Sequence, residues 1–155
     1  MQRVLVTAGA SGIGYALAEA FYAEGYKVWI IDVSENDLKK CPKNWEQTKL
    51  DVSDENAMGD LFSTINNEWG GLDVLCANAG TAGATELIED QDLLAFRKCL
   101  DVNLIGAFLS VKGCLPMMKK QGKGAIIFTS STAGLYGFPY RSPYSASKWA
   151  IHGLM

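Results

Sequence analysis

A tyrosine and a lysine four residues apart, Tyr144 and Lys148, are the pair in this sequence best suited to moving a proton. Positions i and i+4 of a helix share one face, so the two side chains would lie together. A phenol has an unperturbed pKa of about 10 and is a poor base at pH 7, but a neighbouring ammonium favours its phenolate form. The spacing alone is common on solvated helix faces. Here the pair follows an apolar run that ends in Ser130 and Ser131, which favours a catalytic interpretation.

A glycine-rich segment, Thr7 to Gly14, separates the first apolar run from the first helical pattern. Glycine lets the backbone approach a phosphate closely, and a helix N-terminus offers free N–H groups and a positive dipole end. A tight turn without a ligand would have a similar composition. Because the segment lies between a predicted strand and a helix, we favour a dinucleotide phosphate site made by Gly9, Ser11, Gly12, Ile13 and Gly14.

The second apolar run ends at Asp32, whose carboxylate can accept hydrogen bonds from a ribose diol. The same charge would repel a 2′-phosphate. No arginine or lysine occurs in the glycine-rich segment, and Val33 follows Asp32. The sequence therefore favours NAD over NADP as the cofactor. The alternative is that Asp32 caps the next helix.

Two further strand ends carry residues that fit a nucleotide. Asp51 could accept from an adenine amino group while Val52 contacts the ring, although an N-cap at Asp51 is an equal alternative. After the fourth run, Asn78 is followed by two small residues, Ala79 and Gly80, which would let the backbone pass close to a ribose. A plain turn has the same composition.

These residues lie between strands and helices that alternate along the chain, which indicates a doubly wound α/β domain with a parallel sheet. In such a sheet ligands bind beyond the carboxyl ends of the strands. We expect the long fourth helix to break near Asp101 and to kink at Pro116. The predicted strands span residues 3–7, 27–31, 48–52, 74–77 and 125–130, and the predicted helices span residues 13–23, 34–40, 54–69 and 90–121, with a further helix opening at Pro143.

The composition excludes several classes of protein. The chain has 155 residues, 48% hydrophobic and 20% charged, with a net charge of -3, which fits one globular domain without a nucleic-acid-binding face. No run of 18 apolar residues or signal peptide occurs, so we expect no membrane span. Four unpaired cysteines and one histidine make a metal site improbable and indicate a reduced, cytoplasmic protein: Cys41, Cys76, Cys99, Cys114 and His152.

Together these motifs resemble the short-chain dehydrogenase/reductase family in its NAD-linked, single-domain form. That resemblance implies a Rossmann-like fold with five of the usual seven strands. The family's glycine motif matches Thr7 to Gly14 except at Ala8, which occupies the first glycine position. Alanine costs on the order of 1 kcal/mol if that position needs positive φ. Gly9 could absorb the turn instead, and we expect phosphate binding to survive.

The resemblance also assigns catalytic roles, and it implies hydride transfer between NAD(H) and a secondary alcohol or carbonyl. Tyr144 becomes the general acid/base, and Ser131 binds the substrate oxygen. Ser131 is preferred over Ser130 because it keeps the family spacing and because adjacent strand residues face opposite ways. Lys148 binds the nicotinamide ribose and stabilises the phenolate, and Asn103 holds a water that links Lys148 to solvent.

A family member normally continues for about a hundred residues more, within the usual size of one domain. We therefore expect the last two strands and the substrate-binding part to be missing, leaving an exposed sheet edge.

If the chain is complete, the resemblance implies a homodimer or homotetramer through the helices that carry Asn103 and Tyr144. Residues 135–141 could line a substrate pocket or form a packed loop, and we expect His152 at the surface or an interface. The alternatives are a non-catalytic fragment that binds nucleotide or a partner, and, less favoured, an epimerase or dehydratase.

Overall fold

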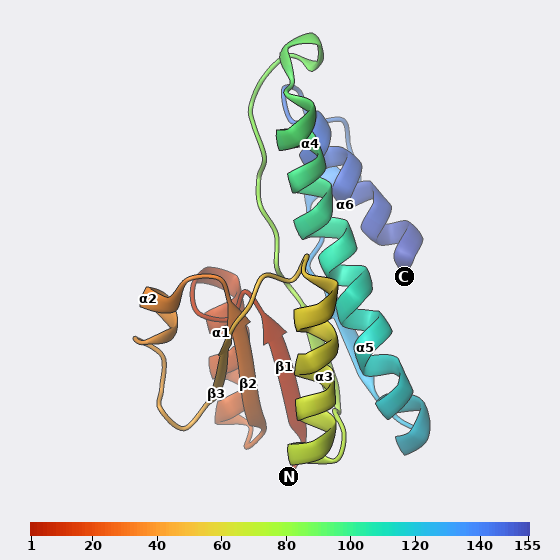
Figure 1. The fold of residues 1–155 in the computed structure, drawn as a ribbon. Coiled ribbons are helices and arrows are strands. Elements are labelled where there is room, and N and C mark those ends of the chain that lie inside the picture. The colour runs from red at the N-terminus through yellow and green to blue at the C-terminus, as the bar shows by residue number, and fades with distance from the viewer.

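A five-stranded parallel sheet in the order β3-β2-β1-β4-β5 organises the computed structural model, which describes residues 1–155 (Figure 1). The order places β1 at the centre, so the chain moves outward in one direction through β2 and β3 and then in the other through β4 and β5. The point of reversal lies at the carboxyl ends of β1 and β4, where doubly wound sheets bind ligands. The strands are β1 (Arg3–Thr7), β2 (Lys27–Asp32), β3 (Glu46–Lys49), β4 (Val74–Ala77) and β5 (Ala125–Phe128).

Helices cover both faces of this sheet, with α3 in front and α1 behind in Figure 1. The helices α4 and α6 extend beyond the carboxyl ends of the strands, where they meet each other. The helices are α1 (Gly12–Ala23), α2 (Glu35–Leu38), α3 (Glu55–Trp69), α4 (Leu93–Leu100), α5 (Gly106–Gln121) and α6 (Ser142–Leu154), with short turns η1 (Ile88–Asp90), η2 (Asp101–Ile105) and η3 (Thr132–Gly134).

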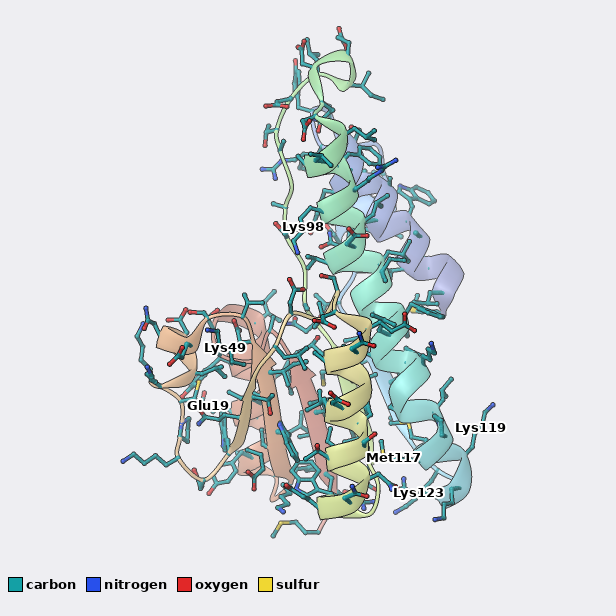
Figure 2. All side chains as sticks on the ribbon, in the orientation of Figure 1. Glu19, Lys49, Lys98, Met117, Lys119 and Lys123 are labelled. Carbon is teal, nitrogen blue, oxygen red and sulfur yellow. The ribbon has the colours of Figure 1, made fainter.

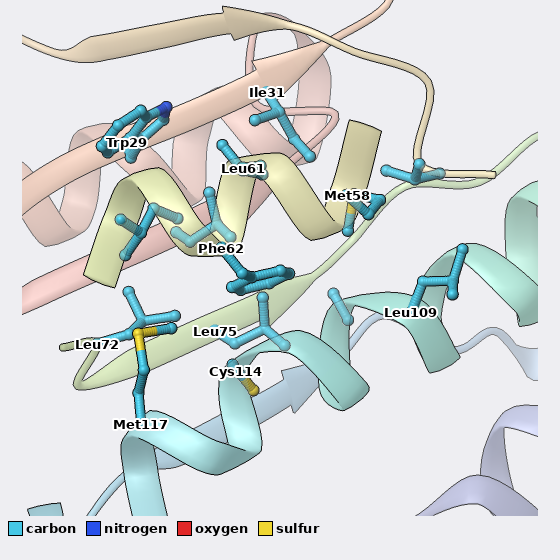
Figure 3. Close-up of a cluster of buried hydrophobic side chains, with 14 of the residues drawn as sticks. Trp29, Ile31, Met58, Leu61, Phe62, Leu72, Leu75, Leu109, Cys114 and Met117 are labelled. Carbon is cyan, nitrogen blue, oxygen red and sulfur yellow. The ribbon is translucent and has the colours of Figure 1, made fainter. Parts of the chain in front are cut away.

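Alternating strand residues divide the core into two layers, because successive side chains of a strand point to opposite faces. Leu5 and Leu75 belong to the larger cluster, which α3 and α5 cover with residues such as Phe62 and Met117 (Figure 3). Val4, Val6, Val74 and Cys76 point the other way and pack with α1. The continuous apolar runs seen in the sequence therefore reflect strands that are buried on both sides.

Two strands end earlier than the sequence predicts. The third strand stops at Lys49 rather than Val52, and the fifth stops at Phe128 rather than Ser130. Lys49 pairs with Asp32 and Phe128 pairs with Ala77, each the last residue of its neighbouring strand. The partner strand thus sets where each ladder ends, and apolar pattern alone does not contain that information.

The break expected near Asp101 is absent. Helix α4 continues through the π-helical turn η2 into α5, giving one helical stretch from Leu93 to Gln121. Pro116 lies inside α5, and the helix continues past it to Gln121. Wider turns of this kind often mark functional positions, and η2 contains Asn103.

This stretch is also, by length and composition alone, apolar enough to cross a membrane, with a mean hydropathy of 1.3 in its best window. The sequence criterion of a continuous apolar run does not detect it. In the fold, buried residues of α5 such as Leu109, Cys114 and Met117 pack in the core against α3 and β4 (Figure 3). The core helix of a sheet protein meets the same criterion, so this feature is weak support for a membrane span.

Candidate active site

The glycine-rich turn after β1 is set by main-chain geometry. Ala8 adopts φ +50°, whereas Gly9 is absent from the residues with positive φ. The expectation that Gly9 absorbs the turn is therefore wrong, because Ala8 itself adopts the left-handed conformation. Gly9 instead allows close packing, since an added Cβ would lie 2.7 Å from Ile30. A Cβ on Gly14 would lie 2.0 Å from the carbonyl oxygen of Ala8, so helix α1 begins in direct contact with the turn.

The start of α1, next to this contact, is open to solvent. Ser11 precedes the helix in an extended conformation, and Ser11, Gly12 and Ile13 are all exposed. The first N–H groups of a helix have no partner within it, and together with the helix dipole they attract anions. An anion such as a phosphate group could therefore bind at this turn, and that part of the sequence analysis stays a prediction.

Asp32 links the second strand end to this turn. One carboxylate oxygen accepts from the Ala10 N–H at 3.2 Å, and the other accepts from the Ser34 N–H at 2.9 Å. Ser34, and not Asp32, caps helix α2 through the N–H of Asp37. The N-cap alternative for Asp32 is therefore wrong. The Asp32 carboxylate lies at the carboxyl end of β2, beside the glycine-rich turn.

A cavity of about 200 Å³ lies at the carboxyl ends of the strands. It brings together four predicted cofactor residues from three separate segments of the chain, the end of β2 and the segments after β3 and β4. Its remaining walls are mostly apolar and come from Ala8, Ile31, Val33, Leu50, Thr81 and Val102. The predicted residues that line the cavity are Asp32, Val52, Ala79 and Gly80.

Asp51 does not line this cavity, although Val52 does. The Asp51 carboxylate accepts from the N–H and hydroxyl of Ser53, at 3.0 and 2.6 Å, and from Lys98 Nζ at 3.0 Å. These contacts, chiefly the Ser53 hydroxyl, lower the pKa of Asp51 to about 2. Asp54 caps helix α3, so the N-cap alternative for Asp51 is wrong. Lys98 lies on α4 above the carboxyl ends of the strands (Figure 2).

Asn78 fastens three strand ends together. Its Nδ2 donates to the Thr7 carbonyl at 3.1 Å, and its Oδ1 accepts from Thr129 Oγ1 at 2.9 Å. The buried Thr7 hydroxyl accepts from the N–H groups of Asn78 and Ala79, both at 2.9 Å. Sequence reasoning missed Thr7 and Thr129. The signal that could have found them is that Thr7 and Thr129 each stand at the end of an apolar run, as Asn78 does.

Tyr144 and Lys148 lie on one face of α6, as predicted, with Lys148 Nζ 5.6 Å from the centre of the Tyr144 ring. Lys148 is only 4% exposed, and its Nζ donates to the Thr129 carbonyl at 2.7 Å. Burial lowers the pKa of Lys148, an effect that Cys99 partly opposes. A Cβ on Gly80 would lie 3.4 Å from this Nζ, so Lys148 is next to the wall of the cavity.

Asn103 is buried in the π-helical turn and connects α6 to the segment after β4. Its Nδ2 donates to the Thr81 carbonyl at 3.0 Å and to Ser147 Oγ at 2.8 Å, while its Oδ1 accepts from the Thr81 N–H at 2.7 Å. Ser147 Oγ in turn donates to the Tyr144 carbonyl at 2.7 Å. Both Nδ2 hydrogens are used, so a water at this side chain could only donate to Oδ1. Sequence reasoning missed Ser147, which lies between Tyr144 and Lys148 on the same helix.

Ser130 and Ser131 point in different directions, as the sequence predicts. Ser131 caps η3 by accepting from the Ala133 N–H at 3.1 Å, and its hydroxyl donates no hydrogen bond within the chain. It is therefore free to donate to a substrate oxygen. Ser130 Oγ instead lies 2.8 Å from His152 Nε2. His152, expected at the surface or an interface, is half-buried by this contact.

The segment between Ser131 and α6 is not a packed loop. Tyr136, Phe138 and Tyr140 are 69%, 49% and 57% exposed, although the Tyr140 carbonyl accepts from the Glu86 N–H at 3.0 Å. The packed-loop alternative is therefore wrong. Exposed aromatic side chains on this segment remain available to contact a substrate.

Comparison with known proteins gives several close matches. (+)-Borneol dehydrogenase 1 of Salvia officinalis is 38% identical over 97% of this chain and 60% of that protein. The structure of an NAD⁺-bound xylitol dehydrogenase matches with a TM-score of 0.94 and 31% identity, covering 99% of this chain and 62% of the other. The structure of ElxO with NADP bound matches with a TM-score of 0.93 and 34% identity, covering 99% and 64%. The chain thus spans less than two thirds of the length of these relatives.

The family model for the short chain dehydrogenase matches residues 2–155. This match extends over the glycine-rich turn, the strand-end cavity and the Tyr144–Lys148 helix described above. The chain therefore belongs to the short-chain dehydrogenase family.

Proposed function

We propose that the chain binds NAD(H) and transfers a hydride between this cofactor and a secondary alcohol or carbonyl compound. The observation that carries the proposal is the cavity at the strand ends, whose wall at Gly80 adjoins the buried Lys148 amine. A cofactor there would place its phosphates at the start of α1 and its reactive ring near Tyr144. The walls match its parts, because apolar residues suit a base and the Asp32 carboxylate suits a ribose.

Asp32 supports NAD rather than NADP. Its two oxygens are held by main-chain N–H groups of Ala10 and Ser34, so the charge cannot easily turn away from the cavity. A 2′-phosphate would be repelled by it. Related structures carry NAD⁺ in xylitol dehydrogenase and NADP in ElxO, so the family does not decide the preference and local residues must.

In the proposed mechanism the protein handles the proton, while the nicotinamide supplies or accepts the hydride. The free Ser131 hydroxyl donates to the substrate oxygen and holds it beside Tyr144. Tyr144 takes the alcohol proton during oxidation and returns it during reduction. Lys148 stabilises the phenolate that this exchange requires. Asn103 and Ser147 fix the turn of α6 that carries Tyr144.

Calorimetric titration with NAD and with NADP tests the cofactor assignment. We expect NAD to bind at least about tenfold more tightly, a difference of about 1.4 kcal/mol. Asp32→Ala should remove most of this preference. Asp60→Ala is the control, because Asp60 is exposed on α3 and does not line the cavity. Equal binding of both cofactors by the unmodified chain, or tighter binding of NADP, would contradict the proposal.

An NADH absorbance assay over a panel of secondary alcohols tests turnover. NAD binding without any turnover would instead favour the alternative of a non-catalytic nucleotide-binding fragment, since the chain spans about three fifths of the length of (+)-borneol dehydrogenase 1. Absence of both binding and turnover would remove the proposed function altogether.

We also propose a homo-oligomer formed through the helices that carry Asn103 and Tyr144. Ile105, Phe108 and Trp149 on these helices are 41%, 44% and 52% exposed, so they offer apolar surface that a second copy of the chain could cover. Light scattering of the purified chain would measure its mass, and a monomer at micromolar concentration would contradict this assembly.

The proposed location is the cytoplasm, where thiols stay reduced. All four cysteines are buried and unpaired. Burial raises the pKa of Cys76 to about 11 and that of Cys114 to about 12, which keeps both thiols protonated and unreactive.

A further inference from the structure

His152 is connected to the catalytic residues by a short series of contacts. Its Nε2 lies 2.8 Å from Ser130 Oγ, and the same hydroxyl lies 3.4 Å from the Lys148 carbonyl oxygen. Residues 148 and 152 are one helical turn apart, so the Ser130 hydroxyl is held between two successive turns of α6. Ser130 is the residue before Ser131, and its position therefore limits where Ser131 can lie.

The turn η3, which follows Ser131, packs closely on α6. It therefore has little room to adjust the position of Ser131 if the contact between Ser130 and His152 is lost. A Cβ on Gly134 would lie 2.7 Å from the Lys148 carbonyl oxygen and 3.0 Å from Ser130 Oγ. The turn η3 thus packs directly on α6 at the same point. Ser131 is extended, with φ -159° and ψ 162°, and an extended residue points away from its neighbour. The Ser130 side chain faces α6, and the Ser131 hydroxyl is left for a substrate.

We propose that His152 is a positioning residue, which holds Ser130 and thereby sets the distance between the Ser131 hydroxyl and Tyr144. One helix then carries both the acid/base residue and the contact that places its serine partner. A serine hydroxyl both donates and accepts, so it can pair with the ring in either protonation state of the histidine. This role rests on the proposed function, because it concerns the geometry of the same reaction.

Amide hydrogen exchange tests the positioning directly and without turnover. The reporter is the Ala133 N–H, which donates to Ser131 Oγ at 3.1 Å. His152→Leu replaces the imidazole with an apolar side chain of similar volume that cannot hydrogen-bond, and we expect exchange at Ala133 to accelerate about fivefold or more. His152→Gln places an amide near the position of Nε2 and should restore slow exchange. The control amide is Ala57, which donates to Asp54 in a similar cap on the distant helix α3.

A second variant guards against unfolding of the leucine variant. Ser130→Ala removes the partner hydroxyl and alters one atom only, and it should accelerate exchange at Ala133 in the same way. As the single histidine of the chain, His152 also gives unambiguous Hε1 and Hδ2 signals in a proton spectrum, which Ser130→Ala should shift. Unchanged exchange at Ala133 in both His152→Leu and Ser130→Ala would overturn the proposal.

Kinetics separate positioning from simple packing. If the chain turns over, His152→Leu should lower kcat about tenfold while the Kd for NAD stays unchanged, and His152→Gln should recover most of the rate. A glutamine variant as slow as the leucine variant would show that only the ring's volume matters, and would also overturn the proposal. If the unmodified chain has no turnover, the proposed activity fails, and the exchange experiment still decides the role of His152.

Discussion

The two halves of the candidate site are built by different means. Around β1 and β2 the tightest constraints lie in the main chain: Ala8 adopts φ +50°, and Gly14 approaches the Ala8 carbonyl so closely that a Cβ would lie 2.0 Å away. The Asp32 carboxylate adds side-chain hydrogen bonds to this turn. Around β5 and α6 the geometry comes from side-chain hydrogen bonds, such as those of Asn103 with Ser147 and of Ser130 with His152. In the first half the close backbone approaches leave no room for an added methyl group. In the second half, several side chains are held by hydrogen bonds that the deletion of one atom would remove.

This difference predicts opposite sensitivities. An added methyl group should weaken cofactor binding in the half around β1 and β2, called the cofactor half below, because close-packed backbone cannot move aside. A deleted hydroxyl should lower the rate or the stability in the half around β5 and α6, called the catalytic half below, because a lost partner leaves a buried polar group unpaired. The following experiments test or refine that contrast, in order of decreasing expected effect.

Tyr144→Phe removes one oxygen from the catalytic half and should have the largest effect. The ring and its packing near Lys148 remain, but the proton donor is lost, so kcat should fall by about 10²–10⁴-fold. The Kd for NAD should change little. Rates are measured by NADH absorbance, with Tyr22→Phe as the control on an exposed ring of α1. Full activity in Tyr144→Phe would show that the assignment of the acid/base residue is wrong.

Gly14→Ala adds one methyl group to the cofactor half. Overpacking against the Ala8 carbonyl should cost about 1–3 kcal/mol, which corresponds to roughly 5–150-fold weaker NAD binding if the turn is displaced. Calorimetry measures this change. Gly59→Ala is the matched control, since nothing lies within 4 Å of its added Cβ, and it should bind NAD normally. Normal NAD binding by Gly14→Ala would remove the contrast between the two halves.

Ala8→Gly deletes a methyl group from the same turn and should stabilise the protein. Alanine at φ +50° is strained, and glycine adopts this conformation readily, so we expect a gain of up to about 1 kcal/mol and a Tm about 2–4 °C higher. Ala20→Gly, on an exposed position of α1, should instead lose about 1 kcal/mol. Thermal unfolding of both variants gives the comparison, and a lower Tm for Ala8→Gly would contradict the strain argument.

The Asp51 carboxylate gives the smallest expected effect, and it depends on pH. Its pKa is lowered from 3.8 to about 2 in the fold, so its stabilisation is present above pH 3.8 and is lost as the pH falls through about 2. The side chain is 40% exposed, which keeps the contribution below about 1 kcal/mol.

Denaturant unfolding at pH 7 and at pH 2 measures this effect. The stability difference between the unmodified chain and Asp51→Asn should shrink at pH 2. Because the Ser53 hydroxyl is the main cause of the lowered pKa, Ser53→Ala should reduce the difference more than Lys98→Met. The reverse order would assign the effect to the ion pair.

Several features of the fold were predictable because they depend on local pattern. The parallel doubly wound sheet follows from alternating apolar runs and helices, and Gly14, Asp32 and Lys148 were found as strand-end or helix-face residues. The ends of β3 and β5 were misplaced because a ladder stops where the neighbouring strand stops. In place of the expected break near Asp101 there is a π-helical turn, in which the buried Asn103 bonds to Ser147 of α6, a contact that no local pattern records.

The roles of strand-end polar residues were less predictable. Asp32 and Asp51 could each have been a helix cap, and only the structure shows that Ser34 and Asp54 occupy those positions instead. Likewise Thr7 entered only as the first residue of the glycine-rich motif, and Thr129 and Ser147 carry no motif that separates them from ordinary threonines and serines. Their importance lies in partners more than fifty residues away for the first two and in the Asn103 amide for the third.

The sequence by itself determined the order of elements, the family resemblance and the chemical identity of the groups at each strand end. These properties depend on residue type and on short spacings, which a linear chain records directly. Only the tertiary structure decided that Asp32 and Gly80 share one cavity, that Asn103 joins α6 through Ser147, and that His152 holds Ser130. Such contacts require parallel strands to bring their carboxyl ends to one edge, and that convergence exists only once the sheet has formed.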